Sequence, residues 1–568
     1  MTLEPERIEG EIRRARQMGD GSSWTPPWRN FAELAEERVS RHGGKTFLVF
    51  YGDGALREEF SYGHFDRLVN QTAAYMAGEL GVGRGDRVAT VMYNHYLTVL
   101  VYFACWKLGA CVVPINVDEA ADRKRFILEN SEAKVVFCRS EYLGEVQRAA
   151  AGLCALRALV TVSEEADTAA SVYPHCIREM PPDPVESSAE MDDDALIVYT
   201  SGTTGPPKGV LLAQYNLMVD ADGIASWHGF TGEHRLMCVL PIHHVNGTIV
   251  TLVTPFYVGG SVVLNRRFSA GAFWERVERE GVHCVSVVPT ILEFLMEAGE
   301  DISRRDLSRF SHVICGAGPL LVETALNFEG RFGVPIVHGY GLSETTCYSC
   351  FLPVDLPPEE RLRWLSEQGF PSIGVPIVHN EMTILGADGR ELGEMERGEI
   401  AIRGRTVMKG YFKRPDANAQ AFSHGWFRSG DEGFFRHDDA GRKFFFITGR
   451  IKELIIRGGL NISPIDIDDV LKTHPKVKFG MAVPFDNKFY GEEIAAYVVP
   501  KEGVVLTEEE VLEHCARRLD FTKQPKVIVF GQDVPYTSTG KSKRLELKRQ
   551  LADQLGRFRD VQFRRKAR

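Results

Sequence analysis

A loop crowded with glycine and hydroxyl side chains constrains this chain more than any other segment does. It runs Tyr199-Thr-Ser-Gly-Thr-Thr-Gly-Pro-Pro-Lys-Gly-Val210. Glycine lets the backbone come close to a ligand, and backbone N–H groups together with hydroxyls can then surround phosphate oxygens. Lys208 adds a positive point charge for those oxygens. A solvated turn is the alternative, but so long an ordered run predicts a phosphate-binding loop.

The flanks of this loop indicate what kind of phosphate loop it is. Residues 195–198 and 210–212 are short apolar runs, which predict strands. A Walker loop needs Gly-Lys followed directly by Ser or Thr and then by a helix. Here Lys208 lies between Pro207 and Gly209. We therefore expect the loop to join two strands, without a helix dipole behind it.

Length and composition predict a soluble chain of two or more domains. The 568 residues are 44% hydrophobic and 25% charged, which is typical of a globular protein too long for one core. The longest apolar stretch, Leu97–Leu108, predicts a buried helix because it is too short to span a bilayer. The formal net charge of −10 argues against nucleic acid as a partner. Scattered cysteines fit buried thiols in a reducing cytoplasm, and we expect no metal at Cys347 and Cys350.

Hydrophobic patterning predicts an α/β fold. From Phe31 to about Phe268, helical periodicities alternate with short Val, Ile and Leu runs, which is typical of layers with largely parallel sheets. A second such stretch covers roughly residues 269–348. Between residues 372 and 447, many short strands with Gly/Asp turns predict a β-rich subdomain.

Three segments follow from this pattern. Residues 1–28 are expected to form a polar N-terminal leader, partly helical around Glu11–Arg16, that packs late or poorly. Residues 29–450 are expected to form a large nucleotide-binding domain of two layered α/β subdomains and the β-rich subdomain. Residues 451–568 are expected to form a small α+β C-terminal domain.

Two later motifs carry side chains suited to nucleotide chemistry. Glu344, within the segment 338–346, offers a hard carboxylate oxygen of the kind that binds Mg²⁺ beside substrate phosphates. In the same segment, Tyr340 offers a face for stacking on adenine and Ser343 offers a hydroxyl near phosphate. Val313–Leu320 is an apolar strand that ends in a glycine turn, and ligands of α/β sheets usually bind at such strand ends.

These motifs, in this order, resemble those of the adenylate-forming superfamily, which includes acyl- and aryl-CoA synthetases, adenylation domains and beetle luciferase. Matching segments cover most of the chain, from about Phe31 to Leu547. The resemblance implies that residues of the phosphate loop, the glycine turns and two strand ends bind ATP and AMP. These residues are Thr200, Ser201, Gly202, Thr203, Thr204, Lys208, Gly316, Ala317, Gly339, Tyr340, Gly341, Ser343, Asp431 and Arg450. It also implies that Glu344 is the Mg²⁺ ligand.

For the C-terminal domain, the resemblance implies a mobile lid that serves two reactions in turn. Lys541 is the implied catalytic lysine, which reaches the acyl carboxylate and the α-phosphate and stabilises the charge that develops there. Lys452 occupies the position of the hinge. The loop that is implied to bind coenzyme A consists of Arg457, Gly458, Gly459 and Leu460.

The acyl group is implied to bind near the segment 241–247, where His244 holds the position of the family's catalytic, gating histidine. The implied pocket residues are His243, His244, Asn246, Gly247, Gly318 and Thr346. If the segment is extended, His244 and Asn246 face the substrate and His243 packs behind them. The segments that form the pocket contain no Asp, Glu, Lys or Arg. This composition disfavours a dicarboxylate or an amine-bearing acid and favours an apolar or mildly polar one.

We therefore expect an AMP-forming acid–CoA ligase. Such an enzyme activates a small-molecule carboxylic acid with ATP and Mg²⁺ to acyl-AMP, and then forms a thioester with coenzyme A as the lid turns. One alternative is an acyl-AMP ligase that loads a carrier protein, and the Gly458-Gly459 loop favours coenzyme A over that acceptor. Another alternative is a non-catalytic nucleotide-binding protein on the same fold. The complete set of implied ATP-site residues argues against it.

Overall fold

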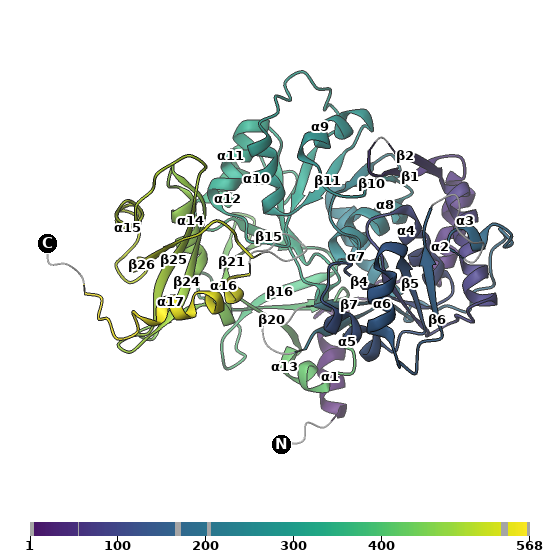
Figure 1. Ribbon diagram of the computed structural model, residues 1–568, viewed down its shortest axis with the longest axis horizontal. Coiled ribbons are helices and arrows are strands. Elements are labelled where there is room, and N and C mark those ends of the chain that lie inside the picture. Colours follow the sequence, from purple (N-terminus) through teal and green to yellow (C-terminus); the bar gives the residue numbers. More distant parts are fainter. Residues whose placement is uncertain (1–4, 55, 165–171, 201–205, 536–542, 565–568) are drawn as a thin grey trace.

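A computed structural model describes residues 5–54, 56–164, 172–200, 206–535 and 543–564 of the chain. Within these ranges the strands form sheets of seven, fourteen and five members. Figure 1 shows the five-stranded sheet with its helices at one end of the molecule, beside the larger body that holds the other two sheets. The predicted architecture, a large α/β domain followed by a small α+β domain, is confirmed.

The seven-stranded sheet carries the glycine-rich loop. Its order is β18-β8-β7-β4-β3-β5-β6; β4, β3, β5 and β6 run parallel to one another, and β8 is antiparallel to β7. The strands are β3 (Arg87–Val91), β4 (Cys111–Ile115), β5 (Val135–Arg139), β6 (Ala158–Val162), β7 (Asp194–Thr200), β8 (Lys208–Ala213) and β18 (Gly410–Tyr411). The loop thus joins two paired strands, β7 and β8, as its apolar flanks predict.

The fourteen-stranded sheet has a parallel part and an antiparallel part. Its order is β16-β17-β20-β21-β15-β14-β13-β12-β11-β9-β10-β1-β2, and β19 pairs with β20 off this path. The parallel part comprises β1 (Thr46–Tyr51), β9 (Arg235–Cys238), β10 (Ser261–Asn265), β11 (Cys284–Val287), β12 (His312–Cys315) and β13 (Ile336–Tyr340), with β2 (Arg57–Ser61) antiparallel at the edge.

The antiparallel part of this sheet is the predicted β-rich subdomain. It comprises β14 (Cys350–Phe351), β15 (Ser372–Pro376), β16 (Asn380–Leu385), β17 (Gly398–Gly404), β19 (Phe422–Ser423), β20 (Trp426–His437) and β21 (Lys443–Arg450). Because β14 pairs with β13, these strands continue the second α/β sheet instead of standing apart from it.

Helices pack on the faces of both large sheets (Figure 1). They are α2 (Phe31–His42), α3 (Tyr62–Gly78), α4 (Tyr96–Lys107), α5 (Ala121–Ser131), α6 (Leu143–Ala150), α7 (Gln214–His228), α8 (Thr254–Val258), α9 (Ala270–Arg279), α10 (Pro289–Ala298), α11 (Val322–Phe332), α12 (Pro358–Ser366) and α13 (Pro415–Ala421), with the 3-10 turns η1 (Ser140–Tyr142) and η2 (His175–Ile177). α4 is buried from Leu97 to Lys107, which confirms the buried helix. Among the described residues, none of the helices has the length and apolar character to cross a membrane.

The N-terminal leader packs against the β-rich subdomain, so the expectation that it packs poorly is wrong. α1 (Pro5–Ala15) buries Ile8 and Ala15, and it lies against β20. The Glu11 carboxylate accepts a hydrogen bond from the Gly425 N–H at 2.8 Å. Apolar residues recur at helical spacing through this polar segment, and that spacing is the signal that its overall polarity concealed.

The C-terminal domain is built on the five-stranded sheet. Its strands are β22 (Ile455–Arg457), β23 (Leu460–Ile462), β24 (Val477–Asn487), β25 (Gly491–Pro500) and β26 (Val527–Phe530), and its helices are α14 (Pro464–Lys472), α15 (Glu508–Ala516), α16 (Arg544–Gln550) and α17 (Ala552–Gly556). The 3-10 turn η5 (Ile451–Glu453) joins this domain to β21. Two apolar clusters form its core. Against the large domain, the Lys472 ammonium lies 3.0 Å from Glu293 of α10.

Candidate active site

Several of the predicted nucleotide residues lie at the carboxyl ends of β12 and β13. The parallel register places Cys315 beside His338, so the glycine turn after β12 adjoins the end of β13. Space here is tight, because a Cβ atom at Gly316 would lie 2.5 Å from the Tyr348 hydroxyl, and one at Gly341 would lie 1.8 Å from the Cys347 carbonyl oxygen. Glycine is therefore required at both positions.

A cluster of Tyr340, Asp431 and Arg450, the nucleotide-side cluster, joins three predicted residues from separate strands. β20 and β21 pair so that Asp431 stands opposite Arg450, and the Arg450 Nε lies 3.1 Å from the Asp431 Oδ1. The Tyr340 hydroxyl donates to the Asp431 Oδ2 at 2.7 Å. Asp431 is buried, whereas the Arg450 side chain is 48% exposed. The cluster thus holds a carboxylate in place while its guanidinium remains open to solvent.

The pKa values of this cluster reflect its charge pairing. The Asp431 carboxylate raises the pKa of Arg450 above its usual range. Burial, and then the same carboxylate, raises the pKa of Tyr340. Both effects favour a protonated tyrosine that donates to a charged aspartate. An aspartate so fixed is suited to accept hydrogen bonds from hydroxyl groups of a sugar.

A second cluster contains Glu344, Tyr411 and Lys208. The Tyr411 hydroxyl donates to the Glu344 Oε1 at 2.8 Å, and the Lys208 Nζ lies 4.7 Å from the centre of the Tyr411 ring. Burial lowers the pKa of Lys208, and the Glu344 carboxylate opposes that shift. Sequence reasoning missed Tyr411, because only the pairing of the two-residue strand β18 with β8 brings it beside the loop.

The donor set around Glu344 fits a magnesium ion that is shared with a substrate. Mg²⁺ normally takes one or two carboxylates and completes its shell with water and phosphate oxygens. Glu344 is buried and offers one such carboxylate. Among the residues that the structure describes, no group of three or more His, Cys, Asp or Glu side chains could hold a metal ion.

The loop after Glu344 contains a strained turn at Thr346. Its φ of 65° and ψ of −64°, with a 2.8 Å hydrogen bond from the Cys347 N–H to the Thr345 carbonyl, define a γ-turn. A β-branched residue at positive φ is a genuine outlier. The Thr346 hydroxyl donates to the Thr406 carbonyl at 2.6 Å, and its side chain is fully buried. The structure therefore places Thr346, predicted to line the acyl pocket, in the framework of the Glu344 loop.

The histidine segment is not extended, so the predicted alternation of its side chains is wrong. Residues 242–244 form a turn, and the π-helix η3 (Asn246–Val253) follows almost at once. Two contacts hold the turn: the Asn94 Oδ1 accepts from the Ile242 N–H at 2.8 Å, and Gly247 packs so closely on the Pro241 carbonyl that a Cβ would lie 2.4 Å away. Gly247 thus has a packing role in addition to its predicted place in the pocket.

Asn246 is engaged in a buried polar network, which opposes its predicted contact with substrate. Its Nδ2 donates to the Tyr348 hydroxyl at 3.1 Å, and its Oδ1 accepts from the Ser286 hydroxyl at 2.7 Å. His243 behaves differently: its Nε2 atom is buried and has no hydrogen-bond partner among the described residues. Burial lowers the pKa of His243 to about 4, so the ring is neutral. The ring of His244 lies 4.4 Å from that of His243.

The remaining predicted residues divide into placed and undescribed ones. Thr200 ends β7, and Ser343 begins the 3-10 turn η4 (Ser343–Thr345). Ala317, with φ of 61°, and Gly318 form the turn after β12, and Gly339 lies within β13. Lys452 is exposed in η5, and its charge helps to lower the pKa of Lys208. Ser201, Gly202, Thr203, Thr204 and Lys541 lie outside the described residues, so their roles stay predictions.

The predicted coenzyme A loop is a tight hairpin whose arginine is buried. Gly458 and Gly459 have φ of 59° and 82° and connect β22 to β23, and Leu460 is 53% exposed. The Arg457 guanidinium points away from solvent and pairs with Glu493 at 2.7 Å. This arginine is therefore positioned differently from a residue that is open to a ligand.

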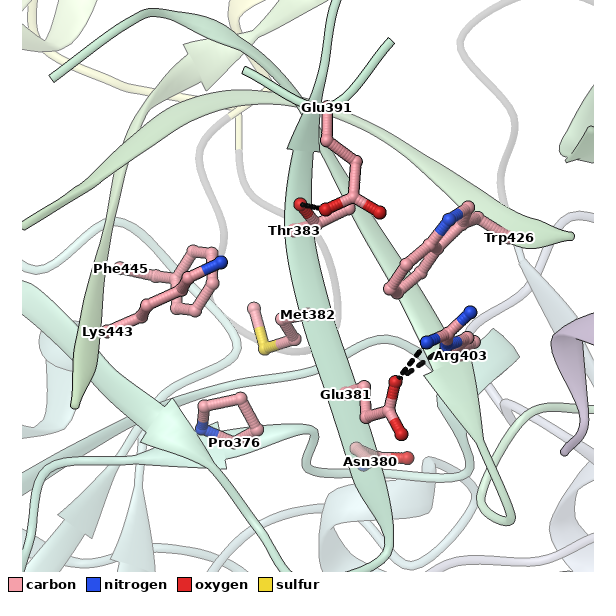
Figure 2. A pocket seen from close by; sticks show the side chains of 10 residues that line it. All are labelled: Pro376, Asn380, Glu381, Met382, Thr383, Glu391, Arg403, Trp426, Lys443 and Phe445. Atoms are coloured by element: carbon pink, nitrogen blue, oxygen red, sulfur yellow. Dashed lines mark hydrogen bonds and ion pairs between the residues drawn. The ribbon is translucent and has the colours of Figure 1, made fainter. Parts of the chain in front are cut away.

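A separate cavity of about 350 Å³ lies in the β-rich subdomain (Figure 2). It shares no lining residue with the two clusters described above. In the cavity wall, Arg403 contacts Glu381 at 2.5 Å and Thr383 donates to Glu391 at 3.1 Å. The Gly19 N–H of the leader also donates to Glu381 at 2.8 Å. We therefore regard this cavity as part of the anchor of the leader.

Fold and site together define a nucleotide-dependent α/β enzyme with a separate C-terminal domain. The sequence model of the AMP-binding enzyme family matches residues 35–412, and that of the AMP-binding enzyme C-terminal domain matches residues 466–541. The chain belongs to this adenylate-forming family. It is an acid–thiol ligase of the AMP-forming acyl-CoA synthetase class, as the sequence predicts.

Individual relatives support the same class. The chain is 36% identical over 470 residues to the sulfoacetate–CoA ligase of Cupriavidus necator, covering 82% of this chain and 88% of the relative. It is 32% identical over 484 residues to the oxalate–CoA ligase of Arabidopsis thaliana, covering 84% and 90%. Among solved structures, the o-succinylbenzoate CoA synthetase of Bacillus subtilis with its acyl-adenylate superposes with a TM-score of 0.78 at 26% identity, covering 92% of this chain and 98% of that one. An anthranilate CoA ligase superposes with a TM-score of 0.82 at 23% identity, covering 94% and 99%.

Proposed function

We propose that this acyl-CoA synthetase acts on a carboxylic acid without a second charged group. We also propose that the nucleotide-side cluster and the cluster of Glu344, Tyr411 and Lys208 carry its ATP-dependent step. The observation that supports the ATP-dependent step is the convergence of the Tyr340 hydroxyl and the Arg450 guanidinium on the Asp431 carboxylate. Side chains from three strands meet there, at the edge where α/β sheets bind ligands.

In the first step, the acid carboxylate attacks the α-phosphate of ATP to give acyl-AMP and pyrophosphate. Asp431 accepts hydrogen bonds from the ribose hydroxyls, and Arg450, half exposed beside it, reaches ribose and phosphate. Lys208 and the phosphate loop bind the departing phosphates, and Lys541 neutralises charge at the α-phosphate. Magnesium held by Glu344 would offset the negative charge of the phosphates.

In the second step, the C-terminal domain turns about Lys452 and presents the Gly458-Gly459 hairpin in place of the Lys541 loop. The thiol of coenzyme A then attacks the acyl carbon of acyl-AMP, the bond to AMP breaks, and the thioester and AMP leave. An exposed residue in a short 3-10 turn between two sheets is suited to be a hinge, because little packing opposes its rotation.

The acid class is supported by the composition of the predicted acyl-pocket segments, which contain no Asp, Glu, Lys or Arg. The network of Asn246, Ser286 and Tyr348 beside them is neutral, and His243 is neutral as well. A second anionic group would be desolvated there without a cation to pair with it, which is costly. The relatives named for sulfoacetate and oxalate act on doubly charged acids by their names, so the substrate of this chain is expected to differ from theirs.

A panel of acids tests the assignment. Sulfoacetate, oxalate, indoleacetate and a fatty acid are each incubated with ATP, Mg²⁺ and coenzyme A, and pyrophosphate, AMP and thioester are measured. We expect indoleacetate or the fatty acid, which carry no second charged group, to give the highest kcat/KM. Thioester and AMP should form in equal amounts. Preference for sulfoacetate or oxalate would refute the acid class. Pyrophosphate release without any thioester, together with loading of a carrier protein, would refute coenzyme A as the acceptor.

A further inference from the structure

The hairpin of β22 and β23 is tied to its domain at its base and open at its tip. Arg457 pairs with Leu460 across the turn and with Gly491 of β25 on its other side. The Gly458 N–H donates to the Tyr490 carbonyl at 2.7 Å. Positive φ at both central residues of a two-residue turn matches the twist of the strands and needs glycine. Beyond this point Leu460 is exposed, so the tip is free to meet another surface.

The base of the hairpin is fixed by a buried ion pair. The Arg457 Nε and Nη2 both donate to the Glu493 Oε1, at 2.9 and 2.7 Å. The side chain of Arg457 is only 6% exposed, and that of Glu493 is 0% exposed. The guanidinium lies 4.1 Å from the centre of the Tyr490 ring and 5.8 Å from that of Phe521. Aromatic rings on a cation add attraction where water is excluded.

A third charge stands beside this pair. Lys526 donates to the carbonyls of Phe521 and Gln524 at 2.5 and 2.7 Å, and its Nζ lies 4.0 Å from the centre of the Phe521 ring. Burial lowers the pKa of Lys526 to about 8, while Glu493 opposes this shift and Arg457 reinforces it. Glu493 is thus the carboxylate partner of Arg457, while Lys526 is held by two backbone carbonyls and feels the charge of Glu493 without pairing with it.

We propose that Arg457 is a positioning residue for thioester formation, which acts through Glu493 and Tyr490 and does not itself bind coenzyme A. A guanidinium that donates two hydrogen bonds to a fully buried carboxylate reaches a ligand only by breaking that pair. The pair instead fixes the strand that leads into the Gly458-Gly459 turn, so that the turn meets the thiol substrate in one orientation. The proposal rests on coenzyme A being the acceptor in the proposed function.

The alternative, direct contact of Arg457 with a phosphate of coenzyme A, makes an opposite prediction about Glu493. If the guanidinium binds the ligand, removal of Glu493 frees it for that contact, and use of coenzyme A is kept or improved. If the pair positions the hairpin, removal of Arg457 and removal of Glu493 disturb the turn to a similar extent, and both impair the use of coenzyme A. Joint replacement by apolar side chains of similar size then restores much of the function, because buried ion pairs can be replaced in this way.

A double-mutant cycle separates the two cases. Arg457→Met, Glu493→Leu and the double variant are compared with the parent protein in ATP–pyrophosphate exchange and in thioester formation from supplied acyl-AMP. We expect exchange to stay near the parent rate in all three. Each single variant should raise the KM for coenzyme A by about 10–100-fold, the scale for misplacing a group by an ångström. The double variant should recover most of that loss.

Two further variants keep the test decisive if a single replacement fails to fold. Arg457→Lys retains the charge but not the two-pronged contact with Glu493, and it should give an intermediate rise in the KM for coenzyme A. Glu513→Gln removes an exposed carboxylate that pairs with Arg517 in the same domain, and it should change neither step. Two results would overturn the proposal. One is a Glu493→Leu variant with the parent KM for coenzyme A together with a double variant whose KM is as high as that of Arg457→Met. The other is an Arg457→Lys variant with the parent KM. If the parent protein forms acyl-AMP but no thioester, the acceptor assignment fails instead.

Discussion

Two arginine–carboxylate–tyrosine clusters lie on either side of Lys452 and differ in their access to solvent. In the nucleotide-side cluster, Arg450 is 48% exposed while Asp431 is buried. The other cluster consists of Arg457, Glu493 and Tyr490, and we call it the hairpin-side cluster. Both of its charged side chains are buried. The chemical groups are the same, so their composition does not distinguish the two clusters.

We expect the difference in exposure to decide which cluster can bind a ligand. A half-exposed guanidinium keeps N–H groups that can turn to a substrate, and water replaces the contact when the substrate leaves. A buried guanidinium has given up its water and depends on one carboxylate. Removal of a carboxylate should therefore impair catalysis in the first cluster and stability in the second.

The largest effect is expected for Glu493. Glu493→Ala leaves Arg457 buried without its carboxylate, which typically costs about 3–5 kcal/mol. Chemical denaturation of the parent and variant proteins measures the free energy of unfolding. Acyl-AMP formation should stay near normal wherever the variant is folded. A loss below about 1 kcal/mol would show that the pair is not a structural anchor and would remove the distinction between the two clusters.

Asp431→Asn should show the converse behaviour. The carboxamide no longer pairs with Arg450 and is a weaker acceptor for ribose hydroxyls, and each hydrogen bond to a charged group is worth about 1.5–3 kcal/mol. We expect acyl-AMP formation to slow by about 10²-fold, with little change in the free energy of unfolding because solvent reaches Arg450. Asp438→Asn, in the turn of the same hairpin, is the matched control and should leave the rate unchanged. A stability loss that equals the rate loss would contradict the comparison.

Sequence patterns located the elements of these clusters but not their contacts. The strands around the phosphate loop were predictable, because apolar runs of that length are typical of strands. Asp431, Arg450 and Tyr340 were identified by motif, whereas Tyr411 carries no motif and depends on the pairing of β18 with β8. Strand pairing between residues about 200 positions apart in sequence cannot be read from local periodicity.

Two features of the structure have physical causes that local patterns do not contain. Arg457 belongs to a loop motif, and a motif gives the residue type but not its burial; its partner Glu493 lies 36 residues further on. The predicted extended form of the histidine segment is wrong, because the residues of the segment do not themselves encode the contacts that fold it. The turn forms because Asn94 and the close packing of Gly247 hold it, and both are tertiary contacts.

A smaller effect is expected at Thr346. Thr346→Gly loses the hydrogen bond to Thr406 but relieves a strain of about 1–2 kcal/mol from the positive φ. The free energy of unfolding should therefore change by less than about 1 kcal/mol. Acyl-AMP formation should fall by about tenfold, because a looser loop no longer fixes Glu344. Thr346→Ser keeps the hydroxyl and should keep most of the rate, and an unchanged rate in the glycine variant would show that Glu344 is held by other contacts.

The smallest effect concerns the contact between the domains, where a half-buried carboxyl group lies on each side. Burial raises the pKa of Asp469 on α14 from 3.8 to about 6. A hydrogen bond from the backbone of Glu323 on α11 opposes this rise, and the Glu323 carboxylate adds to it. Burial likewise raises the pKa of Glu323. The Glu293 carboxylate reinforces this rise, and the Lys472 and Lys501 ammonium groups oppose it. Asp466 and Asp468 add to the shift of Asp469. The protonated carboxyl is thus favoured when α14 is docked on α11.

The sign of the pH dependence follows from this shift. A carboxyl whose pKa is higher in the docked form favours docking fully below its undocked pKa, and this preference is lost as pH rises through about 6. Docking should therefore weaken as the pH rises from about 4 to about 6, and trypsin should cleave after the exposed Lys452 more readily at the higher pH. Asp469→Asn should flatten this change once cleavage is expressed relative to a reference substrate at each pH. Glu297→Gln, across the same boundary but exposed beside Lys478, should retain the parent profile. Parallel profiles for the parent and Asp469→Asn proteins would show that the contact between α11 and α14 does not respond to protons.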